Sequence, residues 1–325
     1  MGRKARNLQK KQSSIKKKKH TNQSKKDSRN FFHRIYEDQY KKLLIIPFTL
    51  LLISLIIIGS LYVQTGDFFH KGITLSGGVT ATALGENIDR ESLETTLLEE
   101  YPEYEINVRK LQDTGTQVGV IVESNILPED EEDLANRFVD RVQEITGVSD
   151  DDLSVETIGA SLGDAFFRQT GLALIVAFLF MGIVVFAYFR AFVPSFAVIL
   201  AAFSNIVMTV AVLNIANFSI GTAGIAAMLM LVGYSVDTDI LLTTRMLKER
   251  EGSVFERQLG AMRTGLTMSF TTIFAALVTF MVAESQVLRE IILIVMIGLI
   301  ADLINTWLQN AGLLRYYLEK KPLVD

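Results

Sequence analysis

Six stretches of the chain are almost wholly apolar, and polar segments separate them. Each apolar stretch is about 19 to 24 residues long, the length that an α-helix needs to cross the hydrocarbon core of a bilayer. The hydropathy pattern therefore predicts six transmembrane helices, at residues 43–63, 170–189, 194–215, 220–242, 265–283 and 291–314.

In the polar region between the first and second predicted helices, residues 64–164, apolar residues recur in short segments, some at the spacing of a strand and some at that of an amphipathic helix. These spacings predict strands at 73–83, 105–111, 117–123 and 153–158, and amphipathic helices at 89–101 and 129–146. Asp89 suits the N-cap of the first of these helices, and Gly147 follows the second. The order strand, helix, strand, strand, helix, strand predicts a ferredoxin-like α+β domain. The expected fold class is a polytopic α-helical membrane protein with this domain inserted.

The distribution of charge predicts how the chain is inserted. Residues 1–42 carry 15 Lys and Arg against three Asp and Glu, a net charge of +12, and should be disordered near their start. Positive charge beside a membrane helix marks the cytoplasmic side, although such a tail also suits anionic lipid. The loop from Arg245 to Arg263 is basic, and the end of the chain carries Arg315, Lys320 and Lys321, so this loop and the tail 319–325 lie on the same side in this topology. Both termini are therefore expected in the cytoplasm. The acidic α+β domain is expected outside the cell, and the remaining five transmembrane helices follow it in residues 165–318.

Composition excludes several kinds of chemistry. The chain has no cysteine, so disulfides, Cys-based zinc sites and a cysteine nucleophile are excluded. It has no Gly-x-x-x-x-Gly-Lys-Ser/Thr loop, so ATP is not expected to be the direct energy source. His20, His33 and His70 lie outside the predicted spans or at their edges, which argues against a buried metal site. No cofactor, metal or enzymatic activity is expected.

Charged residues within the predicted spans are the candidates for function, because an Asp at the centre of a membrane helix costs about 2.5–3.5 kcal/mol on insertion scales. The fourth predicted helix ends with Gly233-Tyr234-Ser235-Val236-Asp237-Thr238-Asp239. Asp237 and Asp239 are about 200° apart around a helix, so they cannot share a face. One interpretation is a protonatable or charged coupling site, and the alternative is a hydrogen-bonded structural anchor.

Polar residues also interrupt the other predicted spans. Asp302, Asn305 and Gln309 fall on one stripe of the sixth, which should face protein or water rather than lipid. A role in transport and simple interhelical hydrogen bonding are equal alternatives for this stripe. Arg263 precedes a run of hydroxyl residues in the fifth and marks either a membrane boundary or a hydrogen-bond network, while Asn205 suits helix–helix contact.

Five segments resemble the SecF family of protein-export membrane proteins, most closely its archaeal members, and the resemblance covers nearly all of the chain after Arg34. They are GITLSGG at 72–78, IGASLG at 158–163, GYSVDTD at 233–239, RTGLTMSFTT at 263–272 and ADLINTWLQNAGLLRYY at 301–317. The third segment is the most specific match. Bacterial members carry Asn-Asp after Gly-Tyr-Ser, whereas Asp237 and Thr238 occupy those places here.

The resemblance implies one half of a SecD/SecF pair, similar in architecture to the resistance–nodulation–division superfamily. Such a protein assists the Sec translocation channel in the cell membrane, beside a SecD-like subunit, and exports unfolded polypeptide with the help of the proton-motive force. The ion-coupling candidates would then be Asp237, Asp239, Arg263, Asp302 and Asn305. The structural motif residues would be Gly77, Gly78, Gly233, Tyr234 and Ser235.

Three other hypotheses compete with this one. The chain could be a passive translocon scaffold without ion coupling, its Asp residues serving only as interhelical hydrogen-bonding groups. An intramembrane aspartyl protease needs two carboxylates around one water, but the Gly-x-Gly-Asp sequence of such enzymes is absent. A general exporter of the same superfamily usually holds both halves in one chain. No nucleic-acid partner is expected.

Overall fold

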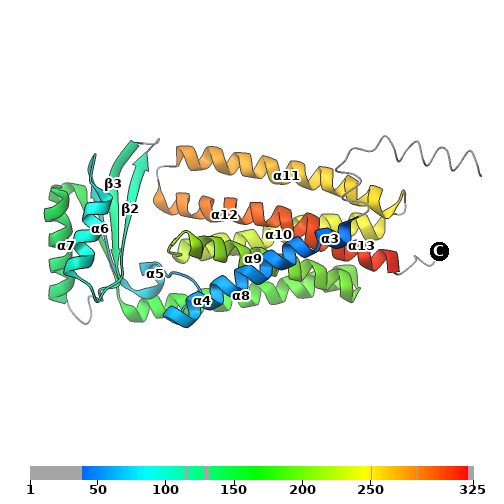
Figure 1. Cartoon of the computed structure of the whole chain (residues 1–325), viewed down its shortest axis with the longest axis horizontal. Helices are drawn as coiled ribbons and strands as arrows, with labels where there is room; N and C mark the ends of the chain where they lie inside the picture. The colour runs from blue at the N-terminus through cyan, green and yellow to red at the C-terminus, as the bar shows by residue number, and fades with distance from the viewer. Residues whose placement is uncertain (1–38, 114–115, 128–131, 250, 284, 321–325) are drawn as a thin grey trace, which may run out of the picture.

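The computed structural model describes residues 39–113, 116–127, 132–249, 251–283 and 285–320, so the predicted disordered tail lies almost wholly outside the described residues. An elongated helix bundle has a small α+β domain at one end (Figure 1). The beginning of the described chain and the end of α13, its last helix, both lie at the other end of the bundle. The chain therefore crosses the bundle an even number of times.

The bundle consists of long apolar helices joined by short loops. They are α3 (Tyr40–Leu43), α4 (Ile45–Thr65), α8 (Ala160–Phe189), α9 (Phe192–Ile215), α10 (Thr222–Lys248), α11 (Val254–Val282), α12 (Gln286–Ile304), a π-helical turn (Asn305–Asn310) and α13 (Ala311–Lys320). Among the described residues, five helices are long and apolar enough to cross a membrane: Tyr40–Thr65, Ser161–Phe189, Phe192–Ile215, Thr222–Lys248 and Val254–Val282.

The sixth predicted span, residues 291–314, runs through α12, the π-helical turn and α13. Helix α12 is not among these five helices because it carries three charged residues, Arg289, Glu290 and Asp302. Helices α9 and α10 form the centre of the bundle, whereas α4, α8 and α11 expose most of their apolar side chains. The core of the bundle packs Leu213 of α9 and Leu231 of α10 with Ile294 and Leu299 of α12.

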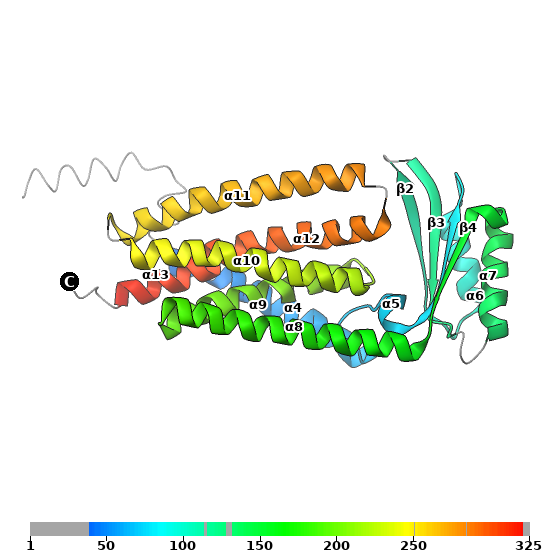
Figure 2. The same cartoon turned by 180° about the vertical axis from the view of Figure 1, so that it is seen from behind.

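The α+β domain contains a four-stranded sheet with two helices on one face. Its elements are β1 (Gly78–Leu84), α6 (Arg90–Glu100), β2 (Ile106–Asp113), β3 (Thr116–Ser124), α7 (Glu132–Thr146), a single 3₁₀ turn (Asp150–Asp152) and β4 (Leu153–Ile158). The strand order is β2-β3-β1-β4 and all neighbours are antiparallel, which confirms the predicted ferredoxin-like arrangement. Helices α6 and α7 cover the face that points away from the bundle (Figures 1 and 2).

The prediction of the first strand, at residues 73–83, is wrong for the start of this range. Ile73–Ser76 forms a short helix, α5, and β1 begins only at Gly78. Gly77 and Gly78 have φ angles of 80° and 138°, which only glycine adopts readily. A Cβ on Gly78 would lie 2.2 Å from the carbonyl oxygen of Ser124, so this glycine also permits the close approach of β3.

Candidate functional site

Helix α10 places its two aspartates in different surroundings, as their helical spacing requires. Asp239 is completely buried, whereas Asp237 is exposed on the opposite face. Ser235 and Thr238 are buried beside Asp239, so the inward face of α10 carries a continuous polar stretch. A buried polar stretch in an apolar helix requires partners on the neighbouring helices.

Those partners come from α12 and the π-helical turn. The Nδ2 atom of Asn310 donates a hydrogen bond of 2.7 Å to Oδ1 of Asp239. The Oδ1 atom of Asp302 accepts hydrogen bonds from the hydroxyls of Ser235 and Thr306. The second carboxylate oxygen of each aspartate has no hydrogen-bond partner among the described residues. The cluster is therefore only partly satisfied.

Asp239 and Asp302 lie close enough to interact electrostatically, although they come from different helices. Two buried carboxylates near one another cannot both carry a negative charge without a large energetic penalty, because no solvent screens them. A proton or a small cation relieves this repulsion. Among the described residues, no group of three or more acidic, His or Cys side chains is placed to hold a metal ion.

The predicted stripe of Asp302, Asn305 and Gln309 does not face a single neighbour. Asp302 faces α10, but Asn305 donates a hydrogen bond of 3.5 Å to the sulfur of Met208 and Gln309 one of 3.0 Å to the hydroxyl of Ser204. Both acceptors lie on α9. The π-helical turn has a wider circumference than an α-helix and presents residues to both neighbours.

Two residues of the carboxylate cluster were missed by the sequence analysis. Thr306 and Asn310 follow Asp302 at intervals of four, so a second stripe of polar residues at helical spacing was present in the sequence. Asn205 of α9 is also buried, and neither polar atom of its side chain has a hydrogen-bond partner among the described residues.

The residues of the Gly-Tyr-Ser segment have different roles. The hydroxyl of Tyr234 donates to that of Ser269 on α11 at 3.4 Å, and Ser235 binds Asp302 as described. Gly233 is exposed on the same side of α10 as Asp237, and a Cβ placed on it would have nothing within 4 Å. Gly77 and Gly78 lie in the α+β domain and have the backbone role described above.

Arg263 is not part of the buried cluster, because its side chain is exposed on α11. The hydroxyl of Thr267 donates to the Arg263 carbonyl at 2.8 Å, and that of Thr271 to the Thr267 carbonyl at 2.7 Å. These hydroxyls are therefore occupied by the backbone of their own helix. The hydroxyls of Thr267 and Thr271 therefore do not join Arg263 in a network of side-chain hydrogen bonds, one of the two alternatives that the sequence left open.

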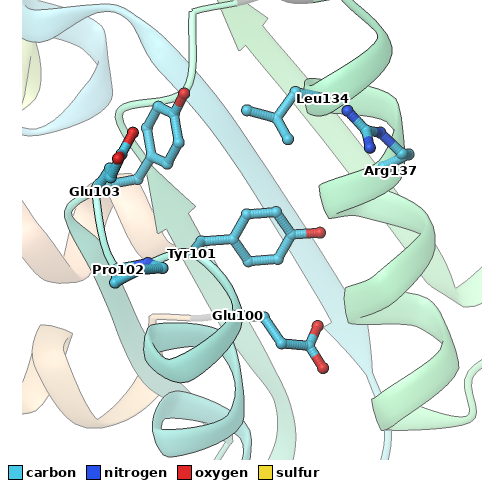
Figure 3. A pocket seen from close by; sticks show the side chains of 7 residues that line it. Glu100, Tyr101, Pro102, Glu103, Leu134 and Arg137 are labelled. Atoms are coloured by element: carbon cyan, nitrogen blue, oxygen red, sulfur yellow. The ribbon is translucent and has the colours of Figure 1, made fainter.

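A separate surface pocket of about 540 Å³ lies in the α+β domain, between the end of α6 and α7 (Figure 3). Glu100, Tyr101, Glu103 and Arg137 are among its lining residues. The ring of Tyr101 contacts Phe138 edge-on at a centroid distance of 5.4 Å, and burial raises the pKa of its hydroxyl. The pocket lies on the helical side of the sheet, away from the bundle, and is distinct from the carboxylate cluster.

The fold and the buried carboxylates define a multi-pass membrane protein with a ferredoxin-like domain inserted after its first span. A crystal structure of SecDF, a translocon-associated membrane protein from Thermus thermophilus, has the same fold, with a TM-score of 0.68 at 18% sequence identity. The match covers 90% of this chain, and the chain spans only 39% of the SecDF chain.

Sequence comparison assigns the family. The family described as protein export membrane protein SecD/SecF, C-terminal, matches residues 139–320. SecF of Pyrococcus furiosus is 37% identical over 86% of this chain and 92% of its own length. SecF of Methanolacinia petrolearia is 36% identical over 89% of this chain and 98% of its own length. SecF of Methanocaldococcus jannaschii is 38% identical over 86% of this chain and 96% of its own length. The chain belongs to the SecF family of protein-export membrane proteins and is of the archaeal type.

Proposed function

We propose that this chain promotes the translocation of unfolded polypeptides across the cell membrane as the SecF subunit of a complex with a SecD-like partner and the Sec translocation channel. Proton movement through the buried carboxylate cluster would drive it. Family membership supports the export role. The SecDF chain is more than twice as long as its matched part, which supports a second half supplied by another polypeptide.

The partly satisfied pair Asp239 and Asp302 carries the ion-coupling part of this proposal. Each carboxylate has one oxygen held by the opposite helix and one without a partner among the described residues. Gain or loss of a proton there changes the charge between α10 and α12 by one unit inside a low-dielectric bundle. Such a change alters which packing of the two helices is preferred, and this is how a local charge event produces a larger movement.

The outward face of α10 supports the proposal that this chain binds a SecD-like partner. Ala226, Met230, Gly233 and Asp237 are exposed at helical spacing along this membrane helix. A charged side chain and a glycine facing lipid would be unfavourable, whereas a second helix bundle can approach a small residue and pair with the carboxylate. We infer that this face contacts the SecD-like subunit. Arg263, also exposed on α11, is then available to the same interface.

The proposed orientation follows from charge. Both termini lie in the cytoplasm, with residues 1–42 and 319–325 as cytoplasmic tails beside anionic lipid, and residues 64–164 form the domain outside the cell. The domain carries six Lys and Arg against 23 Asp and Glu, a net charge of −17. At that position it would contact the polypeptide that emerges from the channel.

The test is export in cells whose only copy carries Asp239→Asn or Asp302→Asn, with exposed Asp140→Asn as the matched control. Asparagine keeps the hydrogen bonds but cannot ionise, so we expect either buried variant to lower the rate of export about tenfold or more. Co-purification of the SecD-like subunit and the channel should be unchanged. Normal export in cells lacking the chain would contradict the export role itself.

A passive scaffold is the second candidate. The observation in its favour is that Asn310 and Ser235 already give each aspartate an interhelical hydrogen bond, as structural polar groups in membrane bundles have. Export at the normal rate in both asparagine variants, with the complex intact, would favour the scaffold over ion coupling.

A further inference from the structure

The outer end of α10 is held by an acid from another helix. Gly221 is the N-cap of α10 and has no side chain to accept a hydrogen bond from the first turn. Instead Glu290, on the first turns of α12, accepts the Gly221 N–H through Oε1 at 3.1 Å. A carboxylate at this position also interacts favourably with the positive end of the helix dipole.

Two glycines form the recess that receives this carboxylate. A Cβ on Gly224 would lie 2.9 Å from Oε1 of Glu290 and 2.7 Å from a side-chain carbon of Ile220. A Cβ on Gly221 would lie 2.8 Å from the hydroxyl oxygen of Thr74. Any larger residue at either position would displace a partner, so the recess exists because both side chains are absent.

The α+β domain is attached to the same helix end. Thr222, the first residue of α10, donates its N–H to the hydroxyl oxygen of Thr74 in α5 at 3.0 Å. Gly72 donates to the Ile220 carbonyl at 2.9 Å, and Ile220 donates to the His70 carbonyl at 2.8 Å. The domain and α10 are therefore joined by a short backbone ladder directly beside the carboxylate.

The sheet supplies the charges that face Glu290. Arg109 of β2 forms an ion pair with Glu123 of β3, and both act electrostatically on Glu290. The guanidinium of Arg109 also lies 5.7 Å from the ring centroid of Phe218, in the loop before α10. The α+β domain thus presents one cation and one anion to the acid that caps α10.

Farther along the helices, α10 and α12 interlock. A Cβ on Gly298 would lie 2.1 Å from a methyl carbon of Leu231, so this leucine fills a notch in α12. Ser235 then meets Asp302. Glu290 and Asp302 are twelve residues apart on α12, about 18 Å at the rise of an α-helix. Packed elements of this kind shift between discrete arrangements rather than deforming gradually.

We propose that Glu290 is a positioning residue that fixes α10, α12 and the α+β domain in one register, so that a shift of α10 at the carboxylate cluster moves the domain. In the proposed export cycle, this contact would link the carboxylate cluster to the α+β domain, so its role in export rests on the proposed function. The attachment itself is a property of the folded chain and is testable without export.

The absence of cysteine allows a direct test by cross-linking. Nδ2 of Asn107 in β2 meets Oγ of Ser219 in the α9–α10 loop at 3.2 Å, and both residues line an open cleft that an oxidant can enter. In the full chain within native membranes, Asn107→Cys with Ser219→Cys reports attachment of the domain. The rate of disulfide formation is compared in Glu290→Ala, in Glu290→Gln and in the exposed control Glu99→Gln.

Glu290→Ala should slow disulfide formation about five- to tenfold, the equilibrium effect of losing a helix cap of this strength. Glu290→Gln retains an acceptor oxygen and should recover most of the rate, and Glu99→Gln should not differ from the parent. Thr74→Val, which removes only the acceptor for Thr222, provides a milder variant and should slow the reaction in the same direction.

A parent rate in both Glu290→Ala and Thr74→Val would overturn the proposal. Export measured on the same strains separates it from the proposed function. Slow cross-linking with normal export would uphold the positioning role of Glu290 and contradict its place in the export cycle. Loss of export in Asp302→Asn beside unchanged cross-linking in both Glu290→Ala and Thr74→Val would leave the export function standing and overturn only this inference.

Discussion

At the scale of single residues, the hydrogen bond between Asn310 and Asp239 joins the π-helical turn to α10. Both side chains are fully buried, and Nδ2 of Asn310 donates to Oδ1 of the carboxylate at 2.7 Å. Asn310→Ala should lower the free energy of unfolding by about 1–3 kcal/mol, because a buried acceptor loses its donor. Thermal unfolding of the purified chain in mild detergent measures this, with exposed Asn136→Ala as the control.

A double-mutant cycle separates this bond from a general loss of packing. With Asp239→Ala and Asn310→Ala combined, the destabilisation should be smaller than the sum of the single changes by about 1 kcal/mol or more. Additive effects would show that the two side chains contribute independently and that the hydrogen bond has little weight.

The same residues show what the sequence can and cannot identify. Asp239 and Asp302 were predictable because a charge within an apolar helix is rare and costly. The spacing also places Thr306 on a stripe with Asp302. Ser204 was not predictable, because neutral polar residues occur often in membrane helices and their partners depend on how the helices pack. Arg263 was singled out by family resemblance, but its exposed position on α11 depends on helix rotation, which its spacing alone did not fix.

At the scale of elements, hydrophobic length and period predicted most of the structure. Strands β2 to β4 and helices α6 and α7 lie within a few residues of their predicted ranges, because alternation and helical spacing are local signals. Helix α5 was taken for strand because Ile73–Ser76 contains β-branched residues. Its conformation is set by the positive φ angles that follow and by the contacts of Thr74 with α10.

The outward face of α10 leads to a prediction about assembly. Gly233→Leu adds a large side chain where a Cβ meets nothing within 4 Å, so the fold of this chain should tolerate it. If the SecD-like subunit packs closely against this face, the same change should lower its co-purification about tenfold, since bundle interfaces depend on small residues. Pull-down from native membranes gives the yield, and thermal unfolding of the purified chain checks that the fold is intact.

Gly59→Leu is the matched control for this prediction, because Gly59 is exposed on α4 and a Cβ there also has nothing within 4 Å. Equal recovery of the partner with both variants would place the interface on another face. Loss of the partner with Gly59→Leu alone would point to α4 instead.

At the scale of the whole molecule, charge and shape agree. The α+β domain, with its net charge of −17, lies at one end of the bundle, and the loop between α10 and α11 lies at the other, near the end of α13. The start of the described chain is at that end too. An even number of crossings follows, which requires α12, the π-helical turn and α13 to form one crossing, although α12 carries three charged residues, Arg289, Glu290 and Asp302.

The two ends of the molecule differ in charge, and the basic residues at the end away from the domain predict its orientation in the membrane. A cysteine-free chain reports it cleanly, because any introduced cysteine is the sole thiol. Glu99→Cys, exposed on α6, should react with a membrane-impermeant maleimide in intact cells. Glu251→Cys, exposed in the α10–α11 loop, should react only after the cells are permeabilised. Because one rigid bundle separates the two positions, the reverse pattern would invert the whole topology and place the acidic domain in the cytoplasm, where it could not meet an exported polypeptide.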